Sequence, residues 1–538
     1  MKQTNNAIKF LMAQYRAIFK NANIAMVAAI AAAALASGQA QAAAGDLEKA
    51  AWEGLTGEVV VGKGAPTYSG SVALTADAEA PVVNNNEFTL KITEGAAHAV
   101  TGHTDNKGGF TAAKGSLVIE GKSGADDTKL EVGKTSGAEV TFKDISVTKG
   151  TLALTKGAIN AGAITLGDTS KLTMADGTVA ADAIDLQSGS TVEITKGTLG
   201  KTGATITVGK DATLQSKGAA QNDANLDGKL SVAGTLDVGD QKHLTLKGAA
   251  EFQSGSTFVS SGTTILTNGA TIDDSTTLTV GSASDIRIGD ATLTLSSANL
   301  KKLLGGAKVQ SMSDKHAVIA LNDETTAEKA LDLVGTSIIG DSDGAVSAKL
   351  AKQGNGSVTV KGDYAKYAGA NEIVGQDGVT LSFKGFTAGK DAAVTFKSGT
   401  VAVSESLAIA GKKALTLDSG NALTLDGATG SVDAESLTIG SSAAAGTLNV
   451  KNGTWTLPDL TVTSGSATVE DQATLKVNGK LTATKAGQLL VKGGTVDVQG
   501  SGSSLVLASA EAKTVQLSAG GVLKIDPESH IIEARNQE

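Results

Sequence analysis

A short phrase of alternating apolar residues recurs every twenty residues in this chain. It reads LALTKGAI from Leu152, LTMADGTV from Leu172 and VEITKGTL from Val192. In each copy, two apolar residues at alternate positions are followed by a glycine and then by another apolar residue. Alternation with a period of two residues is typical of a β-strand. Each twenty-residue unit therefore predicts about three short strands separated by turns.

A constant period favours a solenoid, because each coil must place its inward side chains on those of the coil before it. We expect Leu172 to stack on Leu152, Val192 on Leu172, and Ile184 on Ile164. The sequence thus predicts an all-β fold, a parallel and right-handed β-solenoid (β-helix) with roughly twenty coils of about twenty residues. The alternative is an array of β-sandwiches, but its units would be about 90–100 residues long.

The composition fits a narrow β core and excludes several classes of protein. Glycine is abundant, with 66 residues, whereas aromatic residues make up 3% of the chain and prolines number 4. The absence of cysteine excludes disulfide bonds, thiolate metal sites and cysteine catalysis. The net charge is −9 and only three basic residues are arginine, which argues against nucleic-acid binding.

The N-terminus has the layout of a secretory signal. Residues 1–23 carry four basic side chains and no acidic one, and the apolar run IAMVAAIAAAALA begins at Ile24. Ala40-Gln41-Ala42 then provides the small-x-small pattern of a cleavage site. We therefore expect residues 1–42 to be an extended signal peptide.

The remaining chain divides where the repeat weakens. The stretch DLEKAAWEGL from Asp46 predicts a short helix with Asp46 as its N-cap, within a region that caps the first coil. Ser297–Gly306 and Glu324–Val334 have helical spacing, which predicts either an insertion or a loop excursion from one coil. The expected domains are a cap region (43–110), a solenoid (111–296), an irregular insertion with short helices (297–360) and a second solenoid with a C-terminal tail (361–538).

With its extended signal, its lack of cysteine and repeats such as GTLALTKGAI and GSTVEITKGTL, the chain resembles the passenger region of a Gram-negative autotransporter. The resemblance covers most of residues 43–538 and implies a β-helical, adhesin-type protein on the cell surface. The alternating lipid-facing aromatic residues of a membrane β-barrel are missing from the last 250 residues. We therefore expect a passenger without the C-terminal β-barrel, with a separate outer-membrane translocator as one route of export.

Several short motifs resemble catalytic or metal-binding patterns. GDSDG at residues 340–344 matches the G-x-S-x-G nucleophile pattern around Ser342, but the five histidines supply no supporting pattern for a triad. We interpret this stretch as a turn. Asp341 and Asp343 resemble the start of a calcium loop, yet Lys352 stands where the closing glutamate belongs.

The other polar residues give no stronger signal. Asp273 and Asp274 are interpreted as a coil corner, and His98 and His103 as surface histidines, because their spacing matches no metal motif. Aspartates also recur in the coils, as the carboxylates of β-helical polysaccharide-degrading enzymes do; they are Asp168, Asp176, Asp182 and Asp185. Few aromatic residues are available to stack on sugars. The sequence therefore names no catalytic, cofactor-binding or metal-binding residue, and we expect no cofactor.

The function expected from the sequence is that of an exported, non-enzymatic surface protein. Its partners would be a host-cell, matrix or glycan surface, or other copies of itself, and not nucleic acid. It would lie at the cell surface or outside a Gram-negative bacterium. The alternative is a surface-layer or filament subunit, and a polysaccharide-degrading enzyme is the third reading.

Overall fold

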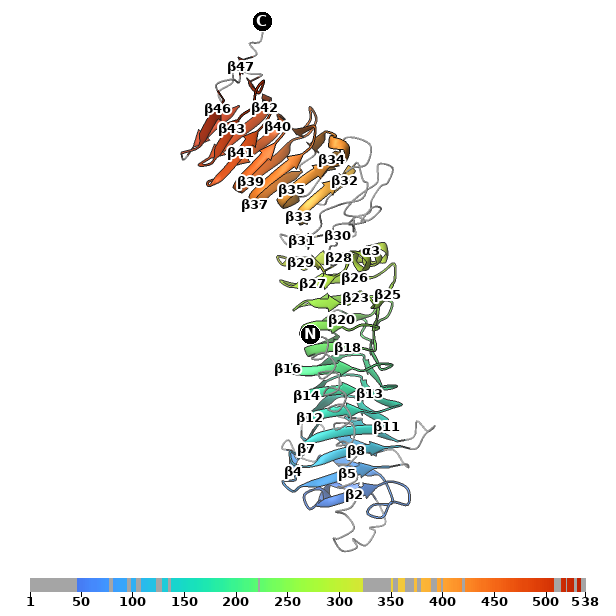
Figure 1. Ribbon diagram of the computed structural model, residues 1–538. Coiled ribbons are helices and arrows are strands. Elements are labelled where there is room, and N and C mark those ends of the chain that lie inside the picture. The colour runs from blue at the N-terminus through green and yellow to red at the C-terminus, as the bar shows by residue number, and fades with distance from the viewer. Residues whose placement is uncertain are drawn as a thin grey trace, which may run out of the picture. The chain divides into compact units, whose positions relative to one another are not determined.

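The computed structural model describes residues 46–533 except 77–80, 94–97, 103–107, 122–127, 134–136, 221–222, 323–349, 352–356, 363–371, 375–378, 389–393, 398–399, 419–420, 508–513, 519 and 527–529. The expected signal peptide and the GDSDG motif lie outside the described residues. The chain divides into two compact units, residues 1–193 (unit 1) and 194–538 (unit 2). Each unit is a stack of parallel β-coils (Figure 1).

Unit 1 begins with a short strand and a one-turn helix and continues as strands. Its elements are β1 (Leu47–Glu48), α2 (Lys49–Trp52), β2 (Gly57–Val61), β3 (Val72–Thr75), β4 (Val82–Val83), β5 (Phe88–Ile92), β6 (His98–Thr101), β7 (Gly109–Ala112), β8 (Ser116–Glu120), β9 (Lys129–Val132), β10 (Ala138–Phe142), β11 (Asp144–Leu154), β12 (Gly157–Leu166), β13 (Ser170–Met174), β14 (Thr178–Leu186) and β15 (Thr191–Ile194).

The first part of unit 2 contains β16 (Gly197–Val208), β17 (Thr213–Ser216), β18 (Ala224–Val232), β19 (Thr235–Val238), β20 (His243–Leu246), β21 (Ala250–Phe252), β22 (Thr257–Ser260), β23 (Thr263–Leu266), β24 (Ala270–Ile272), β25 (Thr277–Val280), β26 (Asp285–Ile288), β27 (Thr292–Leu295), α3 (Ser297–Gly306), β28 (Lys308–Ser311), β29 (His316–Leu321), β30 (Leu350–Ala351) and β31 (Ser357–Gly362).

Its second part contains β32 (Glu372–Val374), β33 (Val379–Ala388), β34 (Val394–Lys397), β35 (Thr400–Ile409), the 3₁₀ turn η2 (Ala410–Lys412), β36 (Leu415–Asp418), β37 (Ala422–Asp433), β38 (Ser436–Ile439), β39 (Gly446–Leu457), β40 (Asp459–Val469), β41 (Ala473–Val477), β42 (Lys480–Lys492), β43 (Thr495–Val498), β44 (Ser504–Leu507), β45 (Val515–Ser518), β46 (Val522–Ile525) and β47 (His530–Glu533).

The predicted all-β, parallel solenoid is confirmed. The turns lie roughly 22 residues apart and number about 17, so the coils are slightly longer and fewer than the sequence predicted. The extra residues lie in corners. The step from Asp285 to its partner Lys308, for example, contains helix α3. The right-handed sense of the solenoid stays a prediction.

Where the repeat is strict, apolar side chains of the same type stack on one another in successive coils, as predicted. Leu152 pairs in register with Leu172, and Ile164 pairs with Ile184. Strand β15, which carries Val192, pairs with β13. These side chains are at most 1% exposed. Burial of such an aliphatic side chain stabilises the fold by about 1.5–3 kcal/mol, so the inward columns hold the coils together.

Glycine is required at the corner of the repeated phrase. Gly177 has φ +123°, and a Cβ atom at this position would lie 2.2 Å from the carbonyl oxygen of Gly157. Gly157 has the same kind of backbone, with φ +112°, and would clash in the same way with Ala138. A side chain would have to displace the backbone of the coil before it, and this explains why the phrase returns with its glycine.

The first coil is closed by aromatic packing around Trp52, at the end of α2. The indole is fully buried and makes edge-to-face contacts with Phe88, Phe110 and Phe142, with ring centroids 5.4–5.9 Å apart. Asn84 donates from Nδ2 to the carbonyl oxygens of Trp52 (2.7 Å) and Leu55 (3.1 Å). These contacts form a plug of aromatic side chains in the first coils, tied down by a buried amide, whereas the extent of a cap region stays a prediction.

The expected N-cap at Asp46 was wrong. The helix is only four residues long, and its N-cap residue is Glu48, which makes no capping hydrogen bond through its side chain. Asp46 instead accepts a hydrogen bond from the Ser71 N–H through Oδ1. Residues 47–48 pair with β3 as strand β1, so the helix begins later than the sequence indicated.

The helical pattern at Ser297–Gly306 is confirmed as α3, and its N-cap is Ser296, whose hydroxyl accepts from the Asn299 N–H. Strands β28, β29 and β31 lie on either side of the gap at residues 323–349 and pair with other strands of unit 2. The second expected helix, Glu324–Val334, lies outside the described residues. The domain boundaries stay predictions.

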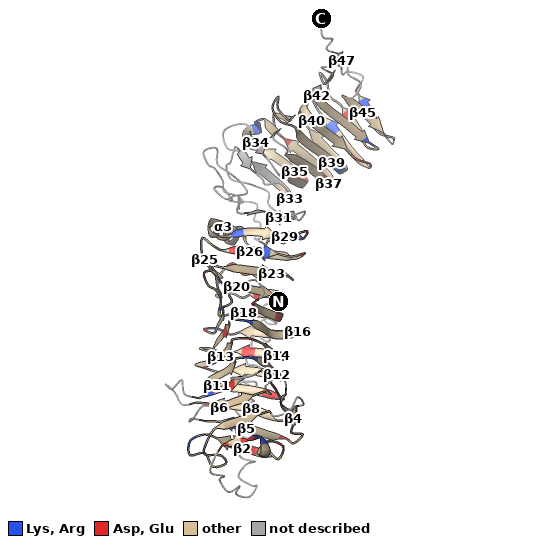
Figure 2. Cartoon of the chain, turned by 180° about the vertical axis from the view of Figure 1, so that it is seen from behind, with Lys and Arg blue, Asp and Glu red and all other residues tan. Residues whose placement is uncertain are grey.

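Acidic and basic residues are scattered along the strands and turns of both units (Figure 2). Several form ion pairs between adjacent coils, such as Lys171 with Glu193 (2.7 Å) and Lys229 with Glu251 (3.3 Å). Pairs this exposed contribute about 0–1 kcal/mol each. Mixed charges of this kind are typical of a solvated protein surface.

Candidate functional site

The most regular surface feature of unit 2 is a set of threonine columns on the outward faces of its coils. Thr416, Thr438, Thr461 and Thr482 pair in register on β36, β38, β40 and β42. On each strand the residues before and after the threonine are fully buried, so the threonine points outward and is partly exposed. The coil spacing sets neighbouring hydroxyls about 4.8 Å apart.

The same face carries further threonines beside this column. Thr463 on β40 and Thr484 on β42 are also partly exposed, and the Thr484 hydroxyl donates to the Thr463 carbonyl oxygen at 2.6 Å. We call these six residues the threonine face; they are Thr416, Thr438, Thr461, Thr463, Thr482 and Thr484. A hydroxyl both donates and accepts hydrogen bonds, so the face offers a repeating polar surface without charge.

Two other columns repeat this arrangement elsewhere in unit 2. One contains Thr429, Thr454, Thr474 and Thr495, and the other Thr213, Thr235, Thr257 and Thr277. Sequence reasoning identified the inward columns and missed the outward ones. The signal that could have found them is the threonine between the apolar residues of phrases such as SLTI, DLTV and KLTA.

The recurring aspartates do not form one acidic cluster. Asp168 and Asp176 lie in turns, whereas Asp182 and Asp185 lie on strand β14. Among the described residues, no three histidine, aspartate or glutamate side chains come together as a metal site would require. These aspartates are therefore corner and surface residues that support no proposed chemistry.

Asp273 lies in a turn between β24 and β25, as predicted for a coil corner. Its Oδ1 accepts hydrogen bonds from the Ser275 hydroxyl (2.6 Å) and from the Ser275 N–H (2.9 Å). These bonds hold the pKa of the Asp273 carboxyl below its usual value. Asp290 has a similar role: hydrogen bonds from Lys315 Nζ and the His316 N–H lower the pKa of its carboxyl. Both carboxylates therefore stabilise corners of the coils.

The interpretation of His98 as a surface histidine was wrong. The imidazole is 1% exposed, and its Nδ1 accepts a hydrogen bond from the Val72 N–H at 2.9 Å. Burial lowers the pKa of His98, outweighing the nearby Thr93 backbone and Asp46, which raise it. The ring is therefore a neutral acceptor that ties β6 to β3. His103 lies outside the described residues, as do Asp341, Ser342 and Asp343.

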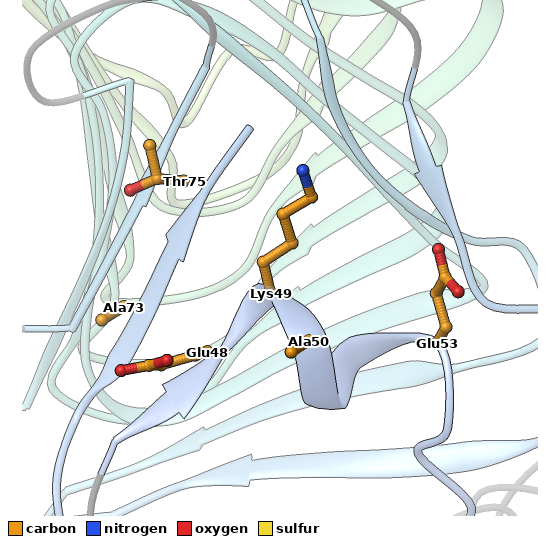
Figure 3. Close-up of a pocket in the computed structure, with 6 residues that line it drawn as sticks. All are labelled: Glu48, Lys49, Ala50, Glu53, Ala73 and Thr75. Carbon is orange, nitrogen blue, oxygen red and sulfur yellow. The ribbon is translucent and has the colours of Figure 1, made fainter. Parts of the chain in front are cut away.

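A shallow hollow lies beside helix α2. It has a volume of about 510 Å³ and is lined by Glu48, Lys49, Ala50, Glu53, Ala73 and Thr75. Figure 3 shows the carboxylates of Glu48 and Glu53 on opposite sides of Lys49. Because these side chains spread apart and both glutamates are exposed, the hollow does not assemble a catalytic pair.

Comparison of the chain with family models, curated proteins and solved structures gives no match. Among the described residues, no helix combines the length and the apolar character needed to cross a membrane. The fold and its surface columns are therefore the basis for the function proposed below.

Proposed function

We propose that this chain is an exported, non-enzymatic surface protein that binds host-cell, matrix or glycan surfaces, in the manner of the adhesin-type autotransporter passengers that it resembles. The observation that carries the proposal is the in-register stacking of outward threonines on coil after coil. A solenoid forms such a surface from a short repeated sequence. When the same phrase recurs in each coil, its threonine hydroxyl recurs at the same place in each coil of the stack.

The surface chemistry suits broad, polar targets. The threonine face presents a repeating set of partly exposed hydroxyls, with the charged residues Asp459 and Lys480 at its edge, so it can hydrogen-bond to a hydroxylated surface. Buried columns beneath it, such as Leu437, Leu460 and Leu481, fix the backbone that carries the threonines. A rigid backbone lowers the entropy lost on binding, which favours recognition through many weak contacts.

Export is tested by expressing the full chain in a Gram-negative host and determining the N-terminus of the protein outside the cytoplasm. We expect it to begin after Ala42. Ile30→Asp should block export, because a carboxylate in the apolar run disrupts the signal. A cytoplasmic protein that retains residues 1–42 would contradict this part of the proposal.

Binding is tested with the fluorescently labelled chain on epithelial cell layers, immobilised matrix proteins and glycan arrays. We expect saturable binding that falls at least ten-fold in Thr438→Lys/Thr461→Lys, which places charge and bulk on the threonine face. The matched control is Thr213→Lys/Thr235→Lys, in a different threonine column. Absence of binding to all three surfaces, or release of oligosaccharide from a polysaccharide by the wild-type chain, would contradict the proposal.

A further inference from the structure

Four asparagines of this chain are followed by a glycine, and three of these pairs lie among the described residues. The three are Asn268-Gly269, Asn452-Gly453 and Asn478-Gly479, whereas Asn355-Gly356 lies outside the described residues. Asparagine before glycine is prone to spontaneous deamidation, because no side chain shields the glycine nitrogen from the asparagine Cγ atom. The three described asparagines are all exposed, so exposure alone does not distinguish them.

The side-chain amides of Asn268 and Asn452 are held by hydrogen bonds to residues of the coil before. Asn268 donates from Nδ2 to the carbonyl oxygen of Lys247. Asn452 donates from Nδ2 to Oδ1 of Asp426 at 2.7 Å. Each side chain must give up this bond before its Cγ atom can turn toward the nitrogen of the next residue. The bond therefore slows deamidation at both positions.

The side chain of Asn478 has no such restraint. Asn478 and Gly479 form the corner between β41 and β42, and the Asn478 N–H donates to the carbonyl oxygen of Leu457 at 3.0 Å. Within the part of the chain that the structure describes, neither the Asn478 side chain nor the Gly479 N–H has a hydrogen-bond partner. The amide carbon and the attacking nitrogen can therefore approach each other without breaking a hydrogen bond to the protein.

We propose that Asn478 is a site of spontaneous deamidation, and that the fold directs the reaction to it in preference to Asn268 and Asn452. The Gly479 nitrogen forms a bond to Cγ of Asn478 while the bond between Cγ and Nδ2 breaks. The Gly479 N–H proton leaves with Nδ2 as ammonia. Water then adds to one of the two carbonyl carbons of the cyclic imide and opens the ring. The product is aspartate or isoaspartate at position 478.

Either product changes the corner that precedes β42. The Asp459 carboxylate lies against Gly479, and its Oδ1 accepts a hydrogen bond from the Lys480 N–H at 2.7 Å. Deamidation adds a second negative charge next to this corner. Isoaspartate also adds one carbon to the main chain there. The inference rests on the hydrogen bonds of these three pairs and not on the proposed binding function.

The test is incubation of the purified full chain at mildly alkaline pH, with mass spectrometry of its peptides at successive times. In the folded chain we expect position 478 to deamidate at least about five-fold faster than positions 268 and 452, where a hydrogen bond must break first. In the chain unfolded by urea, the three positions should react at similar rates, because these hydrogen bonds are then lost.

A substitution tests the role of the side-chain hydrogen bond. Asp426→Ala removes the acceptor of Asn452 and should speed deamidation there at least about two-fold, with position 478 unchanged. The control is Asp433→Ala, at another exposed aspartate of β37, which should leave both rates unchanged. Equal rates at the three positions of the folded chain would overturn the inference. So would the same order of rates in urea, or an unchanged rate at position 452 in Asp426→Ala.

Discussion

At the scale of single residues, His98 makes the stability of unit 1 sensitive to pH. Its buried Nδ1 must stay unprotonated to accept the Val72 N–H, and burial lowers its pKa below the ordinary value of 6.5. The unfolded chain takes up a proton near pH 6.5, before the folded chain does. The free energy of unfolding therefore falls as the pH drops below about 6.5 and does not depend on His98 at higher pH.

The expected loss is at most about 1.4 kcal/mol for each pH unit below 6.5, until the folded-state pKa is reached. It is measured by urea unfolding from pH 7.5 to 5.0 in a Trp455→Phe background, where Trp52 of unit 1 is the remaining tryptophan. His98→Gln should remove this part of the pH dependence, whereas His316→Gln, an exposed histidine of unit 2, should keep it. An identical pH profile in His98→Gln would contradict the assignment.

The residue scale is also where prediction from the sequence was weakest. The spacing of His98 and His103 says nothing about burial, because a solenoid brings His98 against Val72 of the preceding coil through a contact 26 residues apart. The same holds for Asp46, whose partner Ser71 is 25 residues away. Local sequence rules predicted that Asp46 caps a helix. Residues 47–48 instead pair with β3 of the next coil, and this pairing cannot be predicted from the local sequence.

At the scale of elements, the cap formed by α2 and the three phenylalanines stabilises the first coils of unit 1. Trp52 contacts residues on β5, β7 and β10, so a single side chain links several strands. Helix α3 (Ser297–Gly306), by contrast, is a local element whose helical spacing was legible in the sequence, although its N-cap is Ser296 and not the first residue of the predicted stretch. Elements set by local periodicity were predictable, and the plug, which depends on contacts between coils, was not.

Trp52→Ala should therefore destabilise unit 1 by about 3–5 kcal/mol, the usual cost of removing a large buried aromatic ring. Trp52→Phe should cost much less, because the indole Nε1 has no hydrogen-bond partner to lose among the described residues. Hydrogen exchange should quicken in peptides from residues 47–61 of Trp52→Ala and stay unchanged in unit 2. An equal loss of stability in Trp52→Ala and Trp52→Phe would show that the aromatic ring contacts do not close the coil.

At the scale of the whole molecule, one principle accounts for both the core and the surface. In-register stacking repeats whatever each coil presents, so inward leucines become a continuous core and outward threonines become columns. The strict period near residues 152–199 made this stacking predictable. Later coils contain shifts of register, as between Phe383 and Gly385 or Val403 and Ser406, and the sequence period is lost there because bulges insert extra residues.

The most direct test of this stacking uses the absence of cysteine, which makes every introduced pair unambiguous. Thr165→Cys/Asp185→Cys joins register partners in unit 1, and Thr438→Cys/Thr461→Cys joins partners in unit 2. Their Cα atoms should lie about 4.8 Å apart, within the range of a disulfide. Pairs offset by two residues, Thr165→Cys/Ala183→Cys and Thr438→Cys/Thr463→Cys, should lie about 8 Å apart, beyond that range.

The measurement is the yield of disulfide after mild oxidation of the folded chain, read from cross-linked peptides by mass spectrometry. The stacked solenoid predicts near-complete cross-linking of the two in-register pairs and little in the two offset pairs. Equal yields, or cross-linking of the offset pairs alone, would contradict the register on which the core and the threonine face depend.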